Sequence, residues 1–98
     1  MRVRFADANL DHLETDHGFT GGYAPEAVRG FRRVMQVIRA ATDERDFHAM
    51  RSLNFEKLKG GRAGQHSFRL NKQWRLIVTI ESAEPKNIVV VIEIVDYH

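Results

Sequence analysis

The spacing of apolar residues changes about halfway along this chain, and that change limits the folds open to it. From Pro25 onward, apolar residues recur every three or four positions, the period of an α-helix with one buried side. From His66 onward they recur at every second position, the period of a half-buried β-strand. Helices followed by sequential strands predict an α+β fold, with N-terminal helices packed on one face of a small antiparallel sheet.

The first half of the chain is expected to form three helices. The longest begins at Pro25, because proline suits a first helical turn. Its buried side is expected to carry Val28, Phe31, Val34, Met35, Ile38 and Ala41. Shorter helices are expected within residues 7–17 and 43–50, and a glycine-rich loop separates the first of these from the long helix.

The second half is expected to form three sequential strands, in residues 66–71, 74–81 and 88–98. The last of these is apolar on both faces over most of its length, which is typical of a strand inside a sheet covered by a helix. In residues 2–5, "RVRF", polar and apolar residues alternate over a short run, which predicts no more than a short opening strand at a sheet edge.

Composition narrows the class of protein. The 98 residues suit one domain, 1–98, and 43% hydrophobic with 29% charged residues is ordinary for a globular chain. No cysteine is present, so disulfides and thiolate chemistry are excluded. No apolar run approaches the ~20 residues of a membrane helix, and the N-terminus has no signal-peptide pattern. A cytoplasmic protein without a membrane partner is therefore expected.

Positive charge is concentrated in residues 55–75, where Glu56 is the one acidic residue. The basic residues of this stretch are Lys57, Lys59, Arg62, Arg69, Lys72 and Arg75. Such a patch favours a phosphate backbone or an acidic protein surface, although a solvated charged face has the same composition. Three glycines lie nearby, but neither nucleotide-binding loop motif is present, so nucleotide hydrolysis is not indicated.

The last three residues, Asp96, Tyr97 and His98, can all exchange protons or hydrogen bonds. Imidazole titrates near neutral pH, and a neighbouring carboxylate can orient it, which makes the set a candidate for acid–base catalysis. A polar chain end that takes no part in chemistry is the alternative interpretation.

Other residues are better explained by structure than by chemistry. Trp74 can stack on a nucleic-acid base, but its apolar partners in the same strand favour a core position. His12 and His17 do not have a zinc-ligand spacing, so no metal and no cofactor are expected. His48 is expected at the surface, and His66 is expected to be partly buried and hydrogen-bonded.

Two linked motifs carry a family resemblance. The stretch "LKGGRAGQHSFRLNKQWRLIV", followed by a last strand ending in "EIVDYH", resembles the HigB-type toxins of the RelE/ParE superfamily. The resemblance implies a microbial-ribonuclease-like fold and a ribosome-dependent messenger-RNA endoribonuclease of a type II toxin–antitoxin pair. It also implies a HigA-type helix-turn-helix antitoxin as partner, with mRNA in the ribosomal A site as substrate. In that family the RNA's own 2′-OH attacks the adjacent phosphate, so the protein supplies no nucleophile.

The same resemblance implies roles for particular residues. His98 would transfer protons, Asp96 would orient its neighbours and Tyr97 would hydrogen-bond or stack on a base. Lys59 and Arg75 would bind the phosphate, supported by the basic residues Lys57, Arg62, Arg69 and Lys72.

The chain departs from the family pattern at Glu56, where some relatives have histidine. Glu56 is included among the catalytic candidates, although the lysines near it favour the ionised form of its carboxylate. Two alternatives to the enzyme follow. One is a non-cleaving protein that keeps the fold and binds RNA or an antitoxin; the other is a toxin of this fold that acts on another target, such as DNA gyrase.

Overall fold

The structure is a computed structural model, and it describes residues 1–96. Helices come first along the chain and most of the sheet comes later, as the change of period predicts. The elements are β1 (Arg2–Phe5), α1 (Ala8–Thr15), α2 (Pro25–Ala40), α3 (Arg45–Ala49), η1 (Arg51–Leu53), β2 (Glu56–Lys57), η2 (Gly60–Arg62), β3 (His66–Arg69), β4 (Trp74–Glu81) and β5 (Ile88–Asp96).

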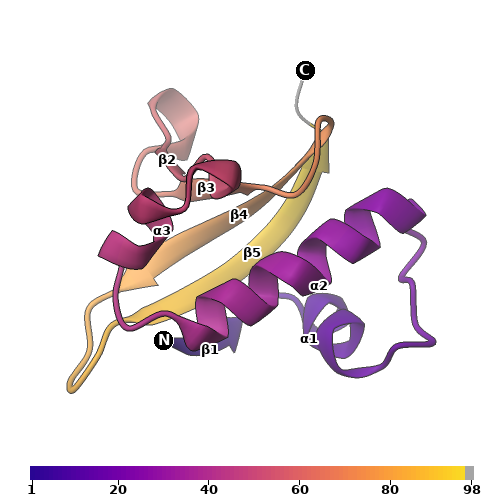
Figure 1. Cartoon of the computed structure of the whole chain (residues 1–98), viewed down its shortest axis with the longest axis horizontal. Helices are drawn as coiled ribbons and strands as arrows, with labels where there is room; N and C mark the ends of the chain where they lie inside the picture. The colour runs from indigo at the N-terminus through magenta and orange to yellow at the C-terminus, as the bar shows by residue number, and fades with distance from the viewer. Residues whose placement is uncertain (97–98) are drawn as a thin grey trace.

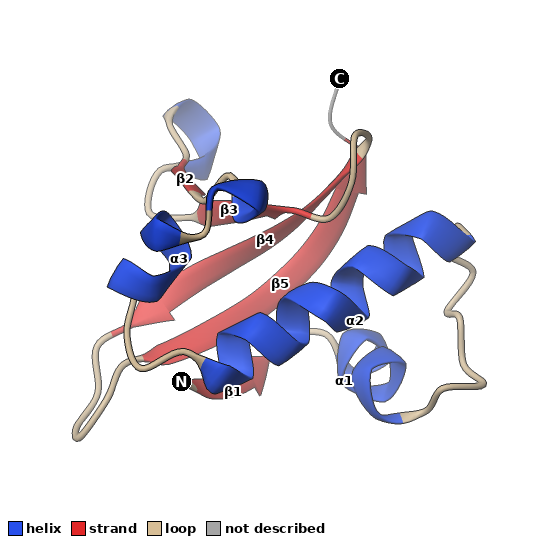
Figure 2. Cartoon of the chain, viewed as in Figure 1, coloured by secondary structure: helices blue, strands red, loops and turns tan. Residues whose placement is uncertain are grey.

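One five-stranded sheet in the order β1-β5-β4-β3-β2 forms one layer of the molecule (Figure 2). Consecutive strands from β2 to β5 pair antiparallel, as the alternating pattern predicts. The sheet is nevertheless mixed, because β1 pairs in parallel with β5 at the edge. Parallel neighbours need a long connection between them, and here all three α-helices and the strands β2 to β4 lie between β1 and β5 in the chain.

All three α-helices lie on one side of this sheet (Figure 1). Helix α2 buries the side that its apolar spacing predicts, and it ends one residue before Ala41, which caps it. The sheet contributes a matching set of apolar side chains from β3, β4 and β5: Phe68, Leu76, Val78, Val89, Val91 and Ile94. Strand β5 lies inside the sheet and α2 lies across the helical side, as predicted.

The face of the sheet turned away from the helices carries a different set of side chains. Residues directly opposite one another in neighbouring strands share a face, so the strand register defines this set. The second face, as it is called below, comprises Glu56, Ser67, Arg69, Arg75, Ile77 and Glu93. It combines the buried apolar Ile77 with charged groups, two of them arginines, whereas the part of the helical face that packs on the helices is apolar.

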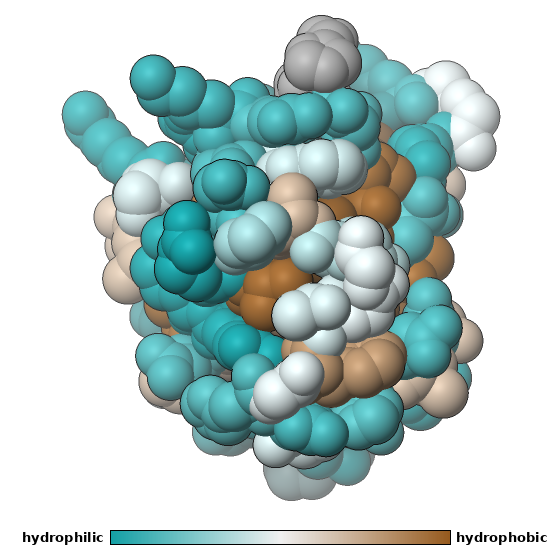
Figure 3. Space-filling model, turned by 90° about the vertical axis from the view of Figure 1, so that its right-hand side faces the viewer, coloured by the Kyte–Doolittle hydropathy of each residue, from teal (hydrophilic) through white to brown (hydrophobic). Residues whose placement is uncertain are grey.

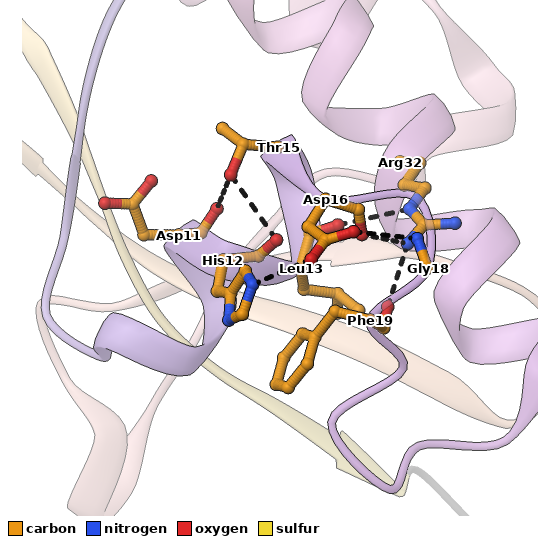
Figure 4. Close-up of polar contacts among 8 residues, drawn as sticks. All are labelled: Asp11, His12, Leu13, Thr15, Asp16, Gly18, Phe19 and Arg32. Carbon is orange, nitrogen blue, oxygen red and sulfur yellow. Dashed lines mark hydrogen bonds and ion pairs between the residues drawn. The ribbon is translucent and has the colours of Figure 1, made fainter.

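The connection between α1 and α2 is held by polar contacts to Arg32 (Figure 4). The Arg32 guanidinium donates to three backbone carbonyls, those of Leu13, Asp16 and Phe19, at 2.9–3.1 Å. A hydrogen bond from the Gly18 amide, together with the contact to the nearby histidine ring, lowers the pKa of the Asp16 carboxyl. These contacts explain how a loop rich in glycine is fixed against α2.

Helix α2 approaches the end of β3 very closely at Gly30. A Cβ atom placed on Gly30 would lie 2.4 Å from the backbone oxygen of Leu70. One turn further along α2, the Arg33 guanidinium donates to that same oxygen at 2.8 Å. Glycine is therefore required here by the distance between helix and backbone.

The outer surface is mainly polar. In the view of Figure 3, hydrophilic residues predominate and apolar ones show in a recess between them. Met50 is a large hydrophobic residue that is exposed, with 43% of its surface accessible to solvent. None of the described helices has the length and hydropathy to cross a membrane.

Candidate active site on the second face of the sheet

An ion pair between Glu56 and Arg75 crosses the second face from the edge strand β2 to β4. Glu56 is on the edge strand β2 and Arg75 is two strands away on β4, and the Arg75 Nη2 to Glu56 Oε2 distance is 3.2 Å. The Arg75 side chain is only 4% exposed, whereas that of Glu56 is 42% exposed. A buried guanidinium thus faces a carboxylate that solvent reaches.

A second ion pair joins the same face to the segment that contains η2. Arg62 Nη2 lies 3.5 Å from Glu93 Oε1 of β5, and Arg62 Nη1 donates to Gln65 at 3.0 Å. This segment therefore lies over part of the second face. Lys59 directly precedes η2 and is exposed.

Three of the predicted cations line one hollow beside this face. The hollow has a volume of about 190 Å3 and is lined by Asn54, Arg69, Asn71, Lys72 and Arg75. Arg69 and Arg75 are directly opposite each other in β3 and β4, which explains why both line the same hollow. Through this hollow a ligand can reach Arg75, although most of that side chain is buried.

Not every basic residue of the stretch joins this cluster. Lys57 follows Glu56 in the same strand, so alternation directs it to the opposite face, where it pairs with His66 of β3. The sequence alone predicts Lys57 and Lys59 on one side of an extended segment. In the structure β2 contains only two residues, and Lys59 belongs to the turn after it.

The end of β5 brings Asp96 close to the β3–β4 connection. Asp96 is opposite Trp74 in the sheet, and its Oδ2 accepts a hydrogen bond from Gln73 Nε2 at 3.0 Å. The other two members of the terminal motif, Tyr97 and His98, lie outside the described residues. Because Asp96 is opposite Trp74 and not Arg75, the register places it on the face of Trp74, at the end of the sheet where Arg75 lies but not on the second face with it.

The residues assigned to structure in the sequence are largely confirmed. Trp74 is partly buried and packs against the core, and His48 is exposed. The His12 ring contacts the Asp16 carboxylate at 3.0 Å and stacks on Phe19, so it serves the α1–α2 connection. Among residues 1–96, no three histidine, aspartate or glutamate side chains gather as a metal site would require.

His66 is partly buried, as predicted, but its contacts are mainly with an aromatic ring. It stacks on Phe55 with ring centroids 5.0 Å apart, and its buried Nδ1 has no hydrogen-bond partner within the described chain. Burial penalises the charged imidazolium and lowers the pKa of His66. Glu44 opposes this shift, while Lys57 and His48 add to it.

This lowered pKa predicts that the protein loses stability in mild acid. Unfolded His66 binds a proton near pH 6.5, whereas the folded form binds it only at lower pH, so folding is disfavoured as the pH falls below about 6.5. Urea unfolding between pH 7.5 and 5.5 should show this decrease. The decrease should be smaller in His66→Phe, which keeps an aromatic ring next to Phe55 but binds no proton, and unchanged in His17→Gln. An equal decrease in all three proteins would contradict the assignment.

Sequence reasoning missed three residues of this region. Glu93 lies within an apolar strand, and its ion pair with Arg62 cannot be predicted without the strand register. Asn54 has a left-handed backbone (φ 42°) just before β2, and it lines the hollow. Arg33 lies on α2, and no sequence signal connects it with the β3–β4 connection that it contacts.

The arrangement can bind an anion and exchange a proton next to it. Arginine is suited to two oxygens of a phosphate, and a group beside it that accepts protons can serve as a base. The second face holds the cation Arg75 and the carboxylate Glu56 within 3.2 Å of each other. Phosphate chemistry without a metal is therefore open to these residues.

Similar proteins were found by fold and by family. A YoeB/ParE toxin from Agrobacterium tumefaciens has a TM-score of 0.61 at 17% identity, with 100% of both chains covered. YafQ from E. coli strain BL21(DE3) has a TM-score of 0.57 at 10% identity, covering 98% of this chain and 93% of its own. The YoeB–YefM complex from Staphylococcus aureus has a TM-score of 0.53 at 16% identity, covering 100% and 97%. At these identities the likeness shows the fold.

No curated protein matches the chain in sequence. The family described as the RelE-like toxin of the type II toxin–antitoxin system HigB matches residues 3–98, which is nearly the whole chain. That match includes both motifs on which the resemblance was based, the basic stretch and the last strand. The chain therefore belongs to the HigB-like toxins, which are RelE-like toxins of type II toxin–antitoxin systems.

Proposed function

We propose that this toxin is a ribosome-dependent mRNA endoribonuclease that acts in the cytoplasm and is neutralised by a HigA-type helix-turn-helix antitoxin. The observation that carries the proposal is the buried Arg75 beside Glu56, at the edge of a cationic hollow. Membership of a family of RelE-like toxins supports it, because endoribonuclease activity is general in that family.

Cleavage would use the RNA's own 2′-OH as nucleophile. The 2′-oxygen forms a bond to the adjacent phosphorus as the bond to the 5′-oxygen breaks, leaving a 2′,3′-cyclic phosphate and a 5′-OH. The reaction needs an acceptor for the 2′-OH proton, a donor for the leaving oxygen and cations for the charge that develops on the phosphate. No further reactant is consumed.

The chain offers a group for each of these tasks. Arg75 would bind the phosphate from within the hollow, with Arg69, Lys72 and Lys59 adding positive charge around it. Glu56 would hold the Arg75 guanidinium in place and is one candidate proton acceptor. His98 is proposed as the group that transfers protons, with Asp96 and Tyr97 beside it, by their match to the family's terminal motif.

Lys57 has a smaller role in this proposal. It points away from the Glu56–Arg75 pair, so it would attract RNA through its charge and would not touch the reacting phosphate. Arg62 is held by Glu93 and would position the η2 segment over the second face.

The test is to map RNA ends after adding the purified toxin to a cell-free translation reaction. Cuts are expected inside translated codons, with a cyclic phosphate on the upstream fragment and a 5′-OH on the downstream one. The same mRNA without a start codon is the control and should stay intact. Arrest of translation with uncut mRNA would refute the proposal and favour a toxin with another target; equal cutting of both RNAs would refute the dependence on the ribosome.

A further inference from the structure

A second hollow, larger than the first, continues from the proposed active site toward α2. It has a volume of about 440 Å3 and is lined by Arg33, Ser52, Arg69, Leu70, Asn71 and Lys72. It shares Arg69, Asn71 and Lys72 with the hollow that reaches Arg75. The two therefore form one path around the β3–β4 connection, from the second face of the sheet to the side of the long helix.

Positive charge lines this whole path. Arg33 lies at one end, Arg69 and Lys72 in the middle and Arg75 at the other end. Within the described residues no carboxylate lines the larger hollow. Nor do Arg33, Arg69 or Lys72 form an ion pair in that part of the chain, whereas Arg75 is paired with Glu56. Three cations thus surround a hollow without the counter-charge that would neutralise them.

Two of these cations are held in place by the backbone of the β3–β4 connection. Arg33 donates to the Leu70 oxygen at 2.8 Å, and Arg69 Nε donates to the Asn71 oxygen at 3.2 Å. The connection itself is closed by the Asn71 side chain, which accepts from the amides of Gln73 and Trp74 at 2.9 and 2.8 Å. Each guanidinium carries five N–H donors, so these bonds leave others for a ligand. These bonds restrict the Arg33 and Arg69 side chains before an anion binds, which lowers the entropy cost of binding.

We infer that the larger hollow is a second phosphate subsite, which binds the phosphate next to the scissile one in a single-stranded RNA. The inference rests on the proposed function, because the scissile phosphate defines which neighbour is meant. A single phosphate would use one end of the path, whereas an RNA strand places phosphates at regular intervals along it. The uncharged Ser52, Asn54 and Asn71 supply hydrogen-bonding groups for ribose and base between the two ends.

This subsite extends the cationic surface to a residue outside the basic stretch. Arg33 belongs to the long helix, and the close approach at Gly30 sets its distance from the β3–β4 connection. The RNA would therefore be held between an element of the helical layer and an element of the sheet.

The experiment measures binding of a short RNA that is 2′-O-methylated throughout and therefore cannot be cleaved. Its affinity is measured by fluorescence anisotropy over a range of salt concentrations. In single strands the slope of log K against log salt is about −0.7 for each phosphate contacted. The double variant Arg33→Gln/Lys72→Gln is expected to lower the magnitude of this slope by about 0.7.

A matched control removes the same charge elsewhere. Arg2 is exposed and donates to the backbone oxygens of Glu84 and Lys86, much as Arg33 donates to that of Leu70. Arg2→Gln/Lys86→Gln changes a region at the opposite end of β4 and should keep the full slope. Equal losses in both double variants would show a general charge effect and would overturn the inference. Thermal unfolding of each variant establishes that it is folded.

A neutral methylphosphonate at either phosphate that flanks the cleavage site identifies the ligand. One such position should weaken binding to the wild-type protein and have little further effect on Arg33→Gln/Lys72→Gln, because both changes remove the same contact. Losses that add in full at both positions would overturn the inference. Failure of the proposed function can be distinguished from failure of this inference. If the protein binds this RNA with the expected slopes but leaves translated mRNA intact, the phosphate subsite is supported and the endoribonuclease activity is refuted.

Discussion

Replacing Arg75 by glutamine is expected to slow cleavage of translated mRNA by about 10²- to 10³-fold. Arg75 is the most buried of the cations in the site, and in the proposed reaction it stabilises the charge that develops on the phosphate. Removal of one preorganised donor from such a position costs this factor in other enzymes. Cleavage rates are measured from the mapped RNA ends under single-turnover conditions.

Two further variants separate catalysis from folding. Arg75→Lys keeps the charge but loses the two-pronged guanidinium, so an intermediate rate is expected. Arg4→Gln breaks another arginine–glutamate pair, with Glu81, at the edge of the sheet, and should leave the rate unchanged. A folded Arg75→Gln protein that cuts at the wild-type rate would remove Arg75 from the mechanism.

Replacing Gly30 by alanine is expected to lower the free energy of unfolding by about 2–3 kcal/mol, which is a large part of the stability of a small domain. The added Cβ would lie 2.4 Å from the Leu70 oxygen and 2.9 Å from both the Leu70 carbonyl carbon and its Cβ. Two of these three atoms are backbone, so α2 has to move away from the β3–β4 connection. The intrinsic preference of helices for alanine, about 1 kcal/mol, recovers only part of this cost.

The same change at Gly61 is the control. A Cβ there would meet nothing within 4 Å, so Gly61→Ala should change stability by no more than about 0.5 kcal/mol. Thermal unfolding should show a melting temperature at least about 10 °C lower for Gly30→Ala than for Gly61→Ala. Equal melting temperatures would mean that α2 is not packed on Leu70 as described.

The helices and most strands could be predicted because their signals are local. The side of α2 that carries Phe31 and Ile38 is buried as its period requires, and β3 and β4 pair as their alternation requires. The parallel pairing of β1 with β5 could not be predicted. Both orientations of a short edge strand satisfy the same alternation, and the path of the chain between the two strands decides which one forms.

The candidate site was predictable as a set of residues but not as an arrangement. The resemblance predicts Arg75, and Glu56 is a candidate at the position where the chain departs from the family pattern, yet the 3.2 Å contact between them depends on the register of β2, β3 and β4. The sequence predicts Lys57 as a third member of the set, but it lies on the other face, because neighbouring residues of a strand point in opposite directions. The sequence does not predict Arg33, because its contact with Leu70 forms only when α2 packs on the sheet.

The amino-acid sequence by itself determined where helices give way to strands, which side of each is apolar, and which stretch of the chain carries the positive charge. Those properties depend on residues only a few positions apart in the chain, so the order of the side chains is enough to predict them. The tertiary structure decided which charges meet, because strand register and the Gly30 contact join residues that are distant in the chain. The buried Arg75, its partner Glu56 and the cationic path that ends at Arg33 exist only at that level.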